Sequence, residues 1–274
     1  MMLDNEILKI DGLSIAFGGL KAVDNLSFSI KENEIFGLIG PNGAGKTTVF
    51  NCITQFYKPN AGSLLFRDRK GEVQELTKHK VHDIIKLGLV RTFQNVELIR
   101  ELSLIDNVLV GGHIDFKSTV FEQALKLPRA VKEEKALRIE AEDILRRLGI
   151  FERKDMIAFG QPYGILKKVE FARTLMSHPK LIILDEPAAG LNDVETLQLA
   201  QMIRQIRDEF QCSILLVEHD MRLVMDVCDR ICAINFGQFL AIGNPKEIQR
   251  NPTVQQAYLG NSEEEQHEKD STVH

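Results

Sequence analysis

The feature that most constrains the fold is a glycine-rich segment near the N-terminus. Residues 40–47 read GPNGAGKT and fit the pattern G-x-x-x-x-G-K-[ST]. Chance produces this pattern in roughly one chain of this length in a hundred. An apolar run precedes the segment and a helical pattern follows it. In such a strand–loop–helix unit, main-chain N–H groups and the helix N-terminus bind phosphate oxygens. The segment therefore predicts a phosphate-binding α/β domain.

The side chains of this loop have separate expected roles. We expect Lys46 to reach the β- and γ-phosphate oxygens, the Thr47 hydroxyl to hold Mg²⁺, and Thr48 to contact the phosphates. The other candidate nucleotide-binding residues of the loop are Asn42, Gly43, Ala44 and Gly45.

A second candidate site lies at Asp185 and Glu186. The apolar run LIIL delivers both carboxylates to the C-terminal end of a buried strand, where open α/β sheets bind ligands. Asp185 suits the Mg²⁺ shell, and Glu186 suits a general base or a residue that orients the attacking water. The alternative is a simple helix cap ahead of Pro187, which the nearby phosphate loop disfavours.

Strands alternate with helices over most of the chain, which predicts an α/β fold with a mainly parallel sheet. The alternation in 8–17 and 25–31 is typical of half-buried antiparallel strands. Further strands are expected at 35–40, 62–69, 181–186 and 213–220, a hairpin at 231–243, and helices at 47–57, 194–210 and 221–231.

The pattern changes to a helical one between about Gln94 and Gln161. Apolar residues recur at helical spacing over 137–148, and two i, i+4 ion pairs are expected on the opposite face. The expected organisation is one α/β domain over 1–260, with a helical subdomain at about 95–172 inserted in the core. Residues 261–274 are expected to form an acidic, disordered tail.

Composition excludes several classes of protein. The net charge is -5, and the acidic C-terminal end carries most of it, so no basic surplus exists to bind nucleic acid. Four cysteines without metal-ligand spacing are expected to be small buried hydrophobes. The start of the chain is unlike a signal peptide, and no apolar run approaches the ~20 residues that span a bilayer. A cytoplasmic chain is expected, and a membrane partner stays open as an alternative.

These motifs resemble the ATP-binding-cassette ATPases, over about residues 5–260. That family has a P-loop NTPase core, RecA-like, with an N-terminal antiparallel β subdomain and a helical insertion, so the resemblance implies this fold and the ligands ATP and Mg²⁺. Phe17 and Val23 match the family's adenine-contacting positions. Gln94 matches its glutamine loop, which implies catalytic and Mg²⁺-binding roles, and His219 matches its switch histidine at the γ-phosphate. An aromatic residue in a strand and a lone histidine could instead be structural.

Several longer stretches resemble the ATP-binding subunits of branched-chain amino-acid importers, among them GLVRTFQN, DEPAAGLN and NPTVQQAYLG. The resemblance implies a peripheral subunit on the cytoplasmic face of the cell's inner membrane. Its partners would be two hydrophobic permease subunits, a second cassette ATPase, and indirectly an extracytoplasmic solute-binding protein. The alternatives are a cassette ATPase for another task, such as lipopolysaccharide export, and a nucleotide-binding regulator that does not hydrolyse ATP.

One departure from the family pattern concerns residues 161–165, which read QPYGI where the family signature is usually LSGGQ. Pro162 offers no hydroxyl and Ile165 offers no amide. Gly164 keeps its main-chain N–H, so this loop is expected to contact a partner's ATP weakly. Losing one charge-assisted hydrogen bond costs about 1.5–3 kcal/mol, or roughly ten- to hundredfold in rate. The expectation is an asymmetric pair of ATP sites in a heterodimer, with a homodimer as the alternative.

Overall fold

The computed structural model describes residues 2–92, 98–112 and 127–258. The chain divides into two compact units, one formed by residues 1–91 with 180–274 and the other by residues 92–179. The predicted insertion at about 95–172 lies within the second unit.

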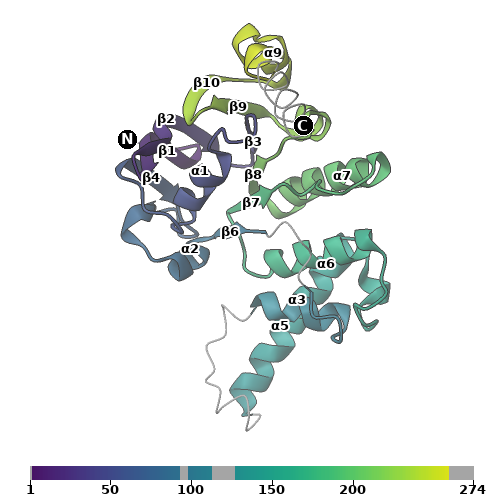
Figure 1. Ribbon diagram of the computed structural model, residues 1–274. Coiled ribbons are helices and arrows are strands. Elements are labelled where there is room, and N and C mark those ends of the chain that lie inside the picture. The colour runs from purple at the N-terminus through teal and green to yellow at the C-terminus, as the bar shows by residue number, and fades with distance from the viewer. Residues whose placement is uncertain (1, 93–97, 113–126, 259–274) are drawn as a thin grey trace. The chain divides into compact units, whose positions relative to one another are not determined.

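A six-stranded sheet forms the centre of the first unit (Figure 1). Its strands are β3 (Ile35–Ile39), β6 (Leu89–Arg91), β7 (Leu181–Asp185), β8 (Ser213–Val217), β9 (Arg230–Asn235) and β10 (Gln238–Gly243). The spatial order is β10-β9-β3-β8-β7-β6, and every pair is parallel except β9–β10. The predicted, mainly parallel sheet is confirmed. Burial on both faces explains why β3, β7 and β8 read as continuous apolar runs.

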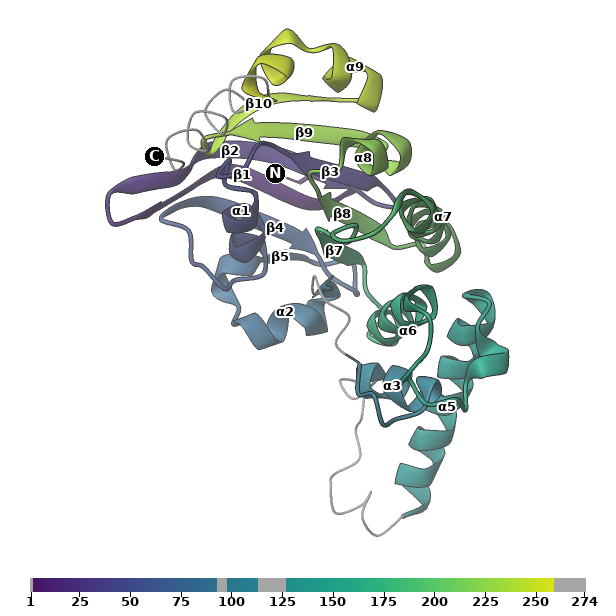
Figure 2. The ribbon, with the colours of Figure 1, turned by 45° about the vertical axis from the view of Figure 1, so that its right-hand side comes forward.

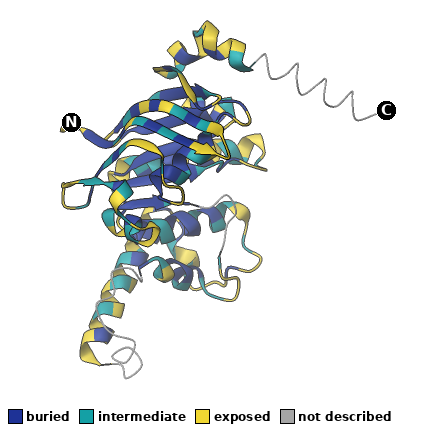
Figure 3. Cartoon of the chain, turned by 60° about the vertical axis from the view of Figure 1, so that its left-hand side comes forward, coloured by how far each residue is buried: buried dark blue, intermediate teal, exposed yellow. Residues whose placement is uncertain are grey.

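The N-terminal strands form a separate antiparallel sheet (Figure 2). Its members are β1 (Glu6–Phe17), β2 (Leu20–Lys31), β4 (Ala61–Arg67) and β5 (Val73–Glu75), followed by a short 3₁₀ turn (Leu76–Lys78) and α2 (Val81–Leu87). The predicted antiparallel strands are confirmed. Their inward-facing apolar residues join Phe50 and Val217 of β8 in one hydrophobic core, dark blue in Figure 3.

Four labelled helices complete this unit: α1 (Lys46–Ile53), α7 (Asp193–Phe210), α8 (Met221–Val227) and α9 (Pro245–Arg250), and residues 252–258 are also helical. Two of them end earlier than predicted. Helix α1 ends at Ile53, since Gln55 has a φ of 62°. Helix α8 ends at Val227, because the chain must become extended to pair β9 with β3. The pairing of β9 with β3 thus ends α8 earlier than its helical periodicity predicts.

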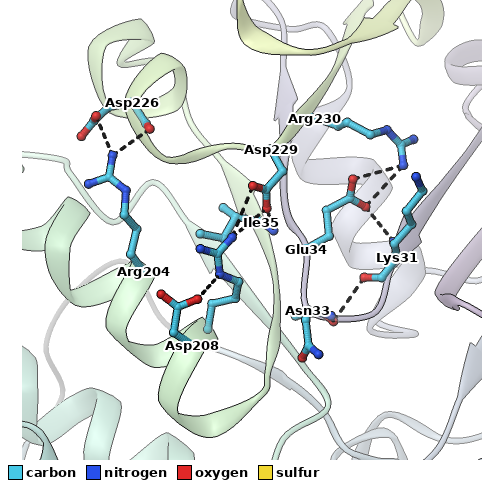
Figure 4. Close-up of polar contacts among 11 residues, drawn as sticks. Lys31, Asn33, Glu34, Ile35, Arg204, Asp208, Asp226, Asp229 and Arg230 are labelled. Carbon is cyan, nitrogen blue, oxygen red and sulfur yellow. Dashed lines mark hydrogen bonds and ion pairs between the residues drawn. The ribbon is translucent and has the colours of Figure 1, made fainter.

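A polar network fixes the register of β9 against β3 at the end opposite the phosphate loop (Figure 4). The Ile35 N–H donates to Asp229 Oδ2 at 2.8 Å, and Arg230 Nη1 lies 3.1 Å from the buried carboxylate of Glu34. Arg207 of α7 also reaches Asp229, at 3.1 Å. These contacts anchor the strand that carries the phosphate loop at its far end.

The second unit is helical. It contains α3 (Leu104–Gly111), α5 (Pro128–Arg147), a 3₁₀ turn (Phe151–Arg153) and α6 (Tyr163–Leu175). The predicted helical pattern is confirmed: Ala141, Ile144 and Leu145 of α5 are buried. The two expected ion pairs join Arg146 to Glu142 at 3.2 Å and Arg147 to Asp143 at 2.8 Å. Among the described residues, no helix is both long and apolar enough to cross a membrane.

All four cysteines are free and buried, as the sequence predicts. Burial raises the pKa of the Cys52 thiol to about 11 and those of Cys212 and Cys232 to about 12, and it raises the pKa of Cys228 as well. Thiolate therefore forms only as the pH rises towards these values. We expect N-ethylmaleimide at about pH 7.5 to leave the folded protein unmodified and to add four labels in guanidinium, by intact mass. Rapid labelling of the folded protein would contradict this burial.

Candidate active site

The phosphate loop connects β3 to α1 and has the conformation that its glycines allow. Gly43 and Gly45 have φ values of 74° and 98°, in the left-handed region. A Cβ at Gly40 would lie 2.3 Å from the Ile234 oxygen, and one at Gly45 would lie 2.6 Å from the Ala22 oxygen. The loop is therefore packed against two other strands, and only glycine fits at these positions.

The turn between β9 and β10 holds this loop in place. The Gly237 N–H donates to the Ala44 oxygen at 2.9 Å, and the Gly237 oxygen accepts from the Asp24 N–H at 2.9 Å. Residues from three distant parts of the chain are thus joined by main-chain hydrogen bonds. This contact fixes the loop without using any of its side chains.

A cavity of about 390 Å³ opens over the loop, within the size range of small-ligand sites. It brings together all seven predicted loop residues and the predicted catalytic glutamate. Its lining residues are Leu20, Lys21, Ala22, Asn42, Gly43, Ala44, Gly45, Lys46, Thr47, Thr48, Glu186 and Phe236. A phosphate chain fits this set, because the N-terminus of α1 and a lysine face the cavity.

Lys46 lines this cavity and is buried, with 8% of the residue exposed. Its Nζ donates to the Gly40 and Pro41 oxygens at 2.5 and 2.9 Å. Burial lowers the pKa of the ammonium, and the charges of Glu186 and Glu218 raise it in part. The ammonium is held by weak neutral acceptors, so phosphate oxygens are better partners for it.

Glu186 and His219 follow adjacent strands and lie side by side. Glu186 has a φ of 45°, uncommon for a non-glycine residue, and its N–H donates to the Val217 oxygen at 2.8 Å. His219 Nδ1 lies 3.7 Å from Glu186 Oε1. Backbone strain at a half-buried carboxylate is typical of a catalytic position, where surrounding contacts impose the geometry.

Glu218 was not singled out from the sequence, yet it organises this part of the site. Its carboxylate is fully buried. One oxygen accepts from the Ala188 N–H at 2.8 Å, and the other accepts from the His219 and Asp220 N–H groups at 2.9 and 3.1 Å. It thus ties the loop after Glu186 to the loop that carries His219. The one feature of the sequence that could have indicated this role is that Glu218 is an acidic residue directly after a buried strand.

Asp185 ends β7, at the sheet edge that the sequence predicted, and pairs with Arg91. Arg91 Nη2 lies 3.0 Å from Asp185 Oδ2, and the Arg91 guanidinium also lies over the Phe50 ring. Burial raises the pKa of the Asp185 carboxyl, while Arg91 lowers it in part. Sequence reasoning did not identify Arg91 as the partner, because the two residues lie on different strands far apart in the chain.

The two predicted adenine-contacting residues are not among the residues that line the cavity. Phe17 is 45% exposed and packs edge-on against Tyr57, with ring centroids 5.2 Å apart. Val23 is fully buried in the core. Gln94 lies outside the described residues. The roles expected for these residues stay predictions.

The segment with the unusual signature belongs to the second unit. Pro162 precedes α6 as its N-cap, and its oxygen accepts the Ile165 and Leu166 N–H groups. Gly164 lies in the first turn, and no side chain caps the helix. One turn further on, Lys167 and Glu170 form a buried ion pair at 2.9 Å. The segment thus begins a regular helix despite its departures from the family pattern.

The donor chemistry of the site suits Mg²⁺. Thr47 offers a hydroxyl in the cavity and Asp185 offers a carboxylate, the hard oxygen ligands that this ion takes together with phosphate oxygens and water. No group of three or more His, Cys, Asp or Glu side chains within the described ranges could hold a metal by itself.

Comparisons with known proteins agree with this geometry. Residues 23–189 match the family model described as ABC transporter, and residues 240–264 match one described as branched-chain amino acid ATP-binding cassette transporter.

Among curated proteins, the chain is 44% identical to the high-affinity branched-chain amino acid transport ATP-binding protein LivG of Salmonella typhimurium. It is 42% identical to BraF of Pseudomonas aeruginosa, which carries the same description. Each alignment covers 94% of this chain and 99% of the relative.

Among solved structures, the chain is similar to the ADP conformation of an ATP-binding cassette of an ABC transporter, with a TM-score of 0.78 and 28% identity. That alignment covers 93% of this chain and 99% of the other. A nucleotide-free cassette gives a TM-score of 0.75 at 28% identity, with 92% of this chain and 98% of the other covered. The chain therefore belongs to the ABC transporter family, and it is an ATP-binding cassette that hydrolyses ATP.

Proposed function

We propose that this chain powers the import of branched-chain amino acids, or of a related small amide or amino acid, through a membrane ABC transporter. The observation that carries the proposal is the end-to-end similarity to LivG and BraF, together with the match of residues 240–264 to a branched-chain amino acid cassette model. The cavity over the phosphate loop supplies the ATP site that such a subunit needs.

The arrangement of side chains supports an in-line hydrolysis. When ATP enters, its phosphate oxygens replace the Gly40 and Pro41 carbonyls as partners of Lys46. Glu186 orients a water molecule and accepts its proton as the water oxygen bonds to the γ-phosphorus. The bond from that phosphorus to the bridging oxygen breaks, leaving ADP and phosphate. His219 contacts the γ-phosphate beside Glu186.

Mg²⁺ would neutralise charge that develops on the phosphate oxygens. Thr47 and Asp185 would hold it, with Gln94 as a further ligand. For Asp185 this means exchanging its ion pair with Arg91 for the metal. Phe17 and Val23 are the proposed adenine contacts from the family resemblance.

The proposed partners are two hydrophobic permease subunits and a second, distinct cassette ATPase, with a solute-binding protein outside the membrane. The chain would then lie on the cytoplasmic face of the inner membrane, and the transported solute would not touch it. Gly164 and the first turn of α6 would face the ATP of the partner cassette. Because Pro162 and Ile165 lack the usual polar groups, that ATP site would be the weaker of the two.

Extraction of the tagged full-length chain from its native membrane in mild detergent, followed by mass spectrometry, tests this function. We expect two permeases and a second cassette ATPase, and ATP-dependent uptake of labelled leucine after reconstitution into vesicles. Recovery of this chain with export-type membrane proteins alone would contradict the importer proposal. That outcome is the relevant alternative, because the chain is also 30% identical to the lipopolysaccharide export ATP-binding protein LptB of Acidithiobacillus ferridurans, over 93% of this chain and 98% of that protein.

A further inference from the structure

Glu218 is a buried carboxylate that the proposed hydrolysis does not use. It directly follows the buried strand β8, and it is the most buried charged residue within the described parts of the chain. It is not among the residues that line the cavity over the phosphate loop. Burial of a charged carboxylate is costly unless strong donors replace the lost water, so a carboxylate at this position is a candidate for a specific role.

The donors to this carboxylate are main-chain groups of two separate loops. Oε1 accepts from the Ala188 N–H in the loop after β7, at 2.8 Å. Oε2 accepts from the His219 and Asp220 N–H groups in the loop after β8, at 2.9 and 3.1 Å. A carboxylate has two acceptor oxygens, whereas a glutamine amide has one and would turn an NH₂ group towards one set of donors. Of these two side chains, only the carboxylate can therefore hold both loops at once.

The loop after β7 has a fixed place on β8, which lies beside β7 in the sheet (Figure 1). The Glu186 N–H donates to the Val217 oxygen at 2.8 Å, and the Glu186 oxygen accepts from the Ala189 N–H at 3.1 Å. The position of Glu186 is thus set by main-chain contacts of its own. Through the hydrogen bond from Ala188 to Glu218, this loop can support the loop after β8.

His219, in contrast, has little side-chain packing to hold it. Its side chain is 57% exposed, and its Nδ1 lies 3.7 Å from Glu186 Oε1 and 3.8 Å from Glu218 Oε2, which is longer than a hydrogen bond. The imidazole therefore lies between two carboxylates without a hydrogen bond from Nδ1 to either. Its place beside Glu186 depends on its main chain, and Glu218 holds the His219 N–H.

We propose that Glu218 is a positioning residue for ATP hydrolysis, which sets the place of His219 relative to Glu186 by holding the two loops together. The inference rests on the roles proposed above for Glu186 and His219 at the γ-phosphate. Glu218 touches neither ATP nor the attacking water, and it acts through the main chain of His219. A change at Glu218 should therefore slow hydrolysis and leave ATP binding almost unchanged.

The first test is E218Q, which keeps the size of the side chain and removes one acceptor. In the assembled complex we expect the rate of phosphate release to fall about 10- to 100-fold, the rate equivalent of one lost hydrogen bond to a charged group. The dissociation constant of the full-length chain for MgATP should stay within about threefold, and the number of ATP sites per chain should not change. A merely structural role would lower that number, because unfolded chains bind no ATP.

E34Q is the matched control, the same change at another buried carboxylate of the first unit. Glu34 accepts from Arg230 and from the Lys31 N–H, at the end of β3 opposite the phosphate loop. E34Q should lower the melting temperature, as E218Q does, because each change removes a buried acceptor. It should leave the rate of phosphate release within about threefold of the unchanged complex.

A double-mutant cycle with H219A shows whether Glu218 acts through His219. The rate of the E186Q complex, which lacks the proposed base of this chain, is first subtracted as the contribution of the other ATP site. In the H219A complex, E218Q should then slow the remaining hydrolysis by less than about threefold, whereas E34Q should have the same effect in both backgrounds.

Hydrogen exchange of the unliganded chain, measured by mass spectrometry, tests the same contacts without activity. Exchange in E218Q should be faster in the peptides that contain Ala188 and His219, and unchanged in those of the helical second unit. If H219A lowers the rate to that of the E186Q complex, this measurement decides.

An E218Q complex that hydrolyses ATP at the unchanged rate would overturn the inference. An E218Q effect of full size in the H219A complex, or unchanged exchange in both peptides, would overturn it as well. Normal hydrolysis by H219A would instead contradict the role of His219, and failure of the unchanged chain to bind MgATP would contradict the ATP site. None of these results depends on which solute is transported, so the importer proposal is tested separately.

Discussion

Replacing Glu186 with glutamine is expected to lower the ATPase rate of the assembled complex by about 10²- to 10⁴-fold, the usual contribution of a general base. Glutamine keeps the size of the side chain, but it cannot accept a proton from the attacking water. Glu186 lines the cavity beside the phosphate loop, so the loss should fall on hydrolysis and not on binding. Phosphate release and the ATP dissociation constant, measured on the same preparation, separate the two.

The matched control is E134Q, the same chemical change at an exposed residue of α5. It should leave the hydrolysis rate unchanged. An E186Q complex that turns over ATP within a few-fold of the unchanged complex would show that another group activates the water.

Phosphate release by the assembled complex also tests the asymmetry of the two ATP sites. The double variant P162S with I165Q restores the usual hydroxyl and amide at the start of α6. We expect it to raise turnover by at most about tenfold, because it improves the weaker site only. E186Q should therefore have a much larger effect than this repair. Effects of equal size would contradict the heterodimer with one weak site.

Replacing Lys46 with alanine is expected to weaken ATP binding by at least about a hundredfold. The ammonium is the cation buried in the wall of the phosphate cavity, and a charge-assisted hydrogen bond to a phosphate oxygen is worth about 1.5–3 kcal/mol. K46A loses more than one such bond. Equilibrium binding of a fluorescent ATP analogue measures the loss, and K70A, at an exposed lysine of the first unit, is the control.

Removing the charge of Lys46 should not lower the thermal stability of the protein without ATP. Burial lowers the pKa of Lys46, so folding disfavours its charged form at neutral pH, and removing the charge relieves that cost. We therefore expect K46M, which keeps an unbranched side chain, to melt no lower than the unchanged protein. ATP binding of K46A as tight as that of the unchanged protein, or a large destabilisation of K46M, would contradict the role assigned to this lysine.

The sequence predicted those parts of the site that depend on short-range pattern. The phosphate loop and the Asp185–Glu186 pair are each a contiguous run at the end of a buried strand, so their position at one sheet edge follows from chain direction alone. The early ends of α1 and α8 could not be predicted, because they depend on a left-handed residue and on strand pairing with β3.

Contacts between distant segments account for the remaining residues of the site. The sequence pattern does not predict which arginine reaches Asp185, which carboxylate supports the His219 loop, or which aromatic ring lines the cavity. Arg91, Glu218 and Phe236 hold these positions because of sheet order and turn geometry. Each lies next to a recognisable motif, yet none belongs to a contiguous pattern that specifies its role.

The central position of β3 has a consequence for how the protein is made. Its neighbours are β8 and β9: Ile35 pairs with Ile214 and Phe36 with Arg230, which are 179 and 194 residues further along the chain. At a synthesis rate of about 5–20 residues per second, roughly 10–40 s pass between the emergence of β3 and that of its partners. During this interval the ribosome-bound chain presents an apolar strand with both edges open. The ATP site therefore cannot form until translation is almost complete, and the nascent chain should depend on chaperones that shield such a strand.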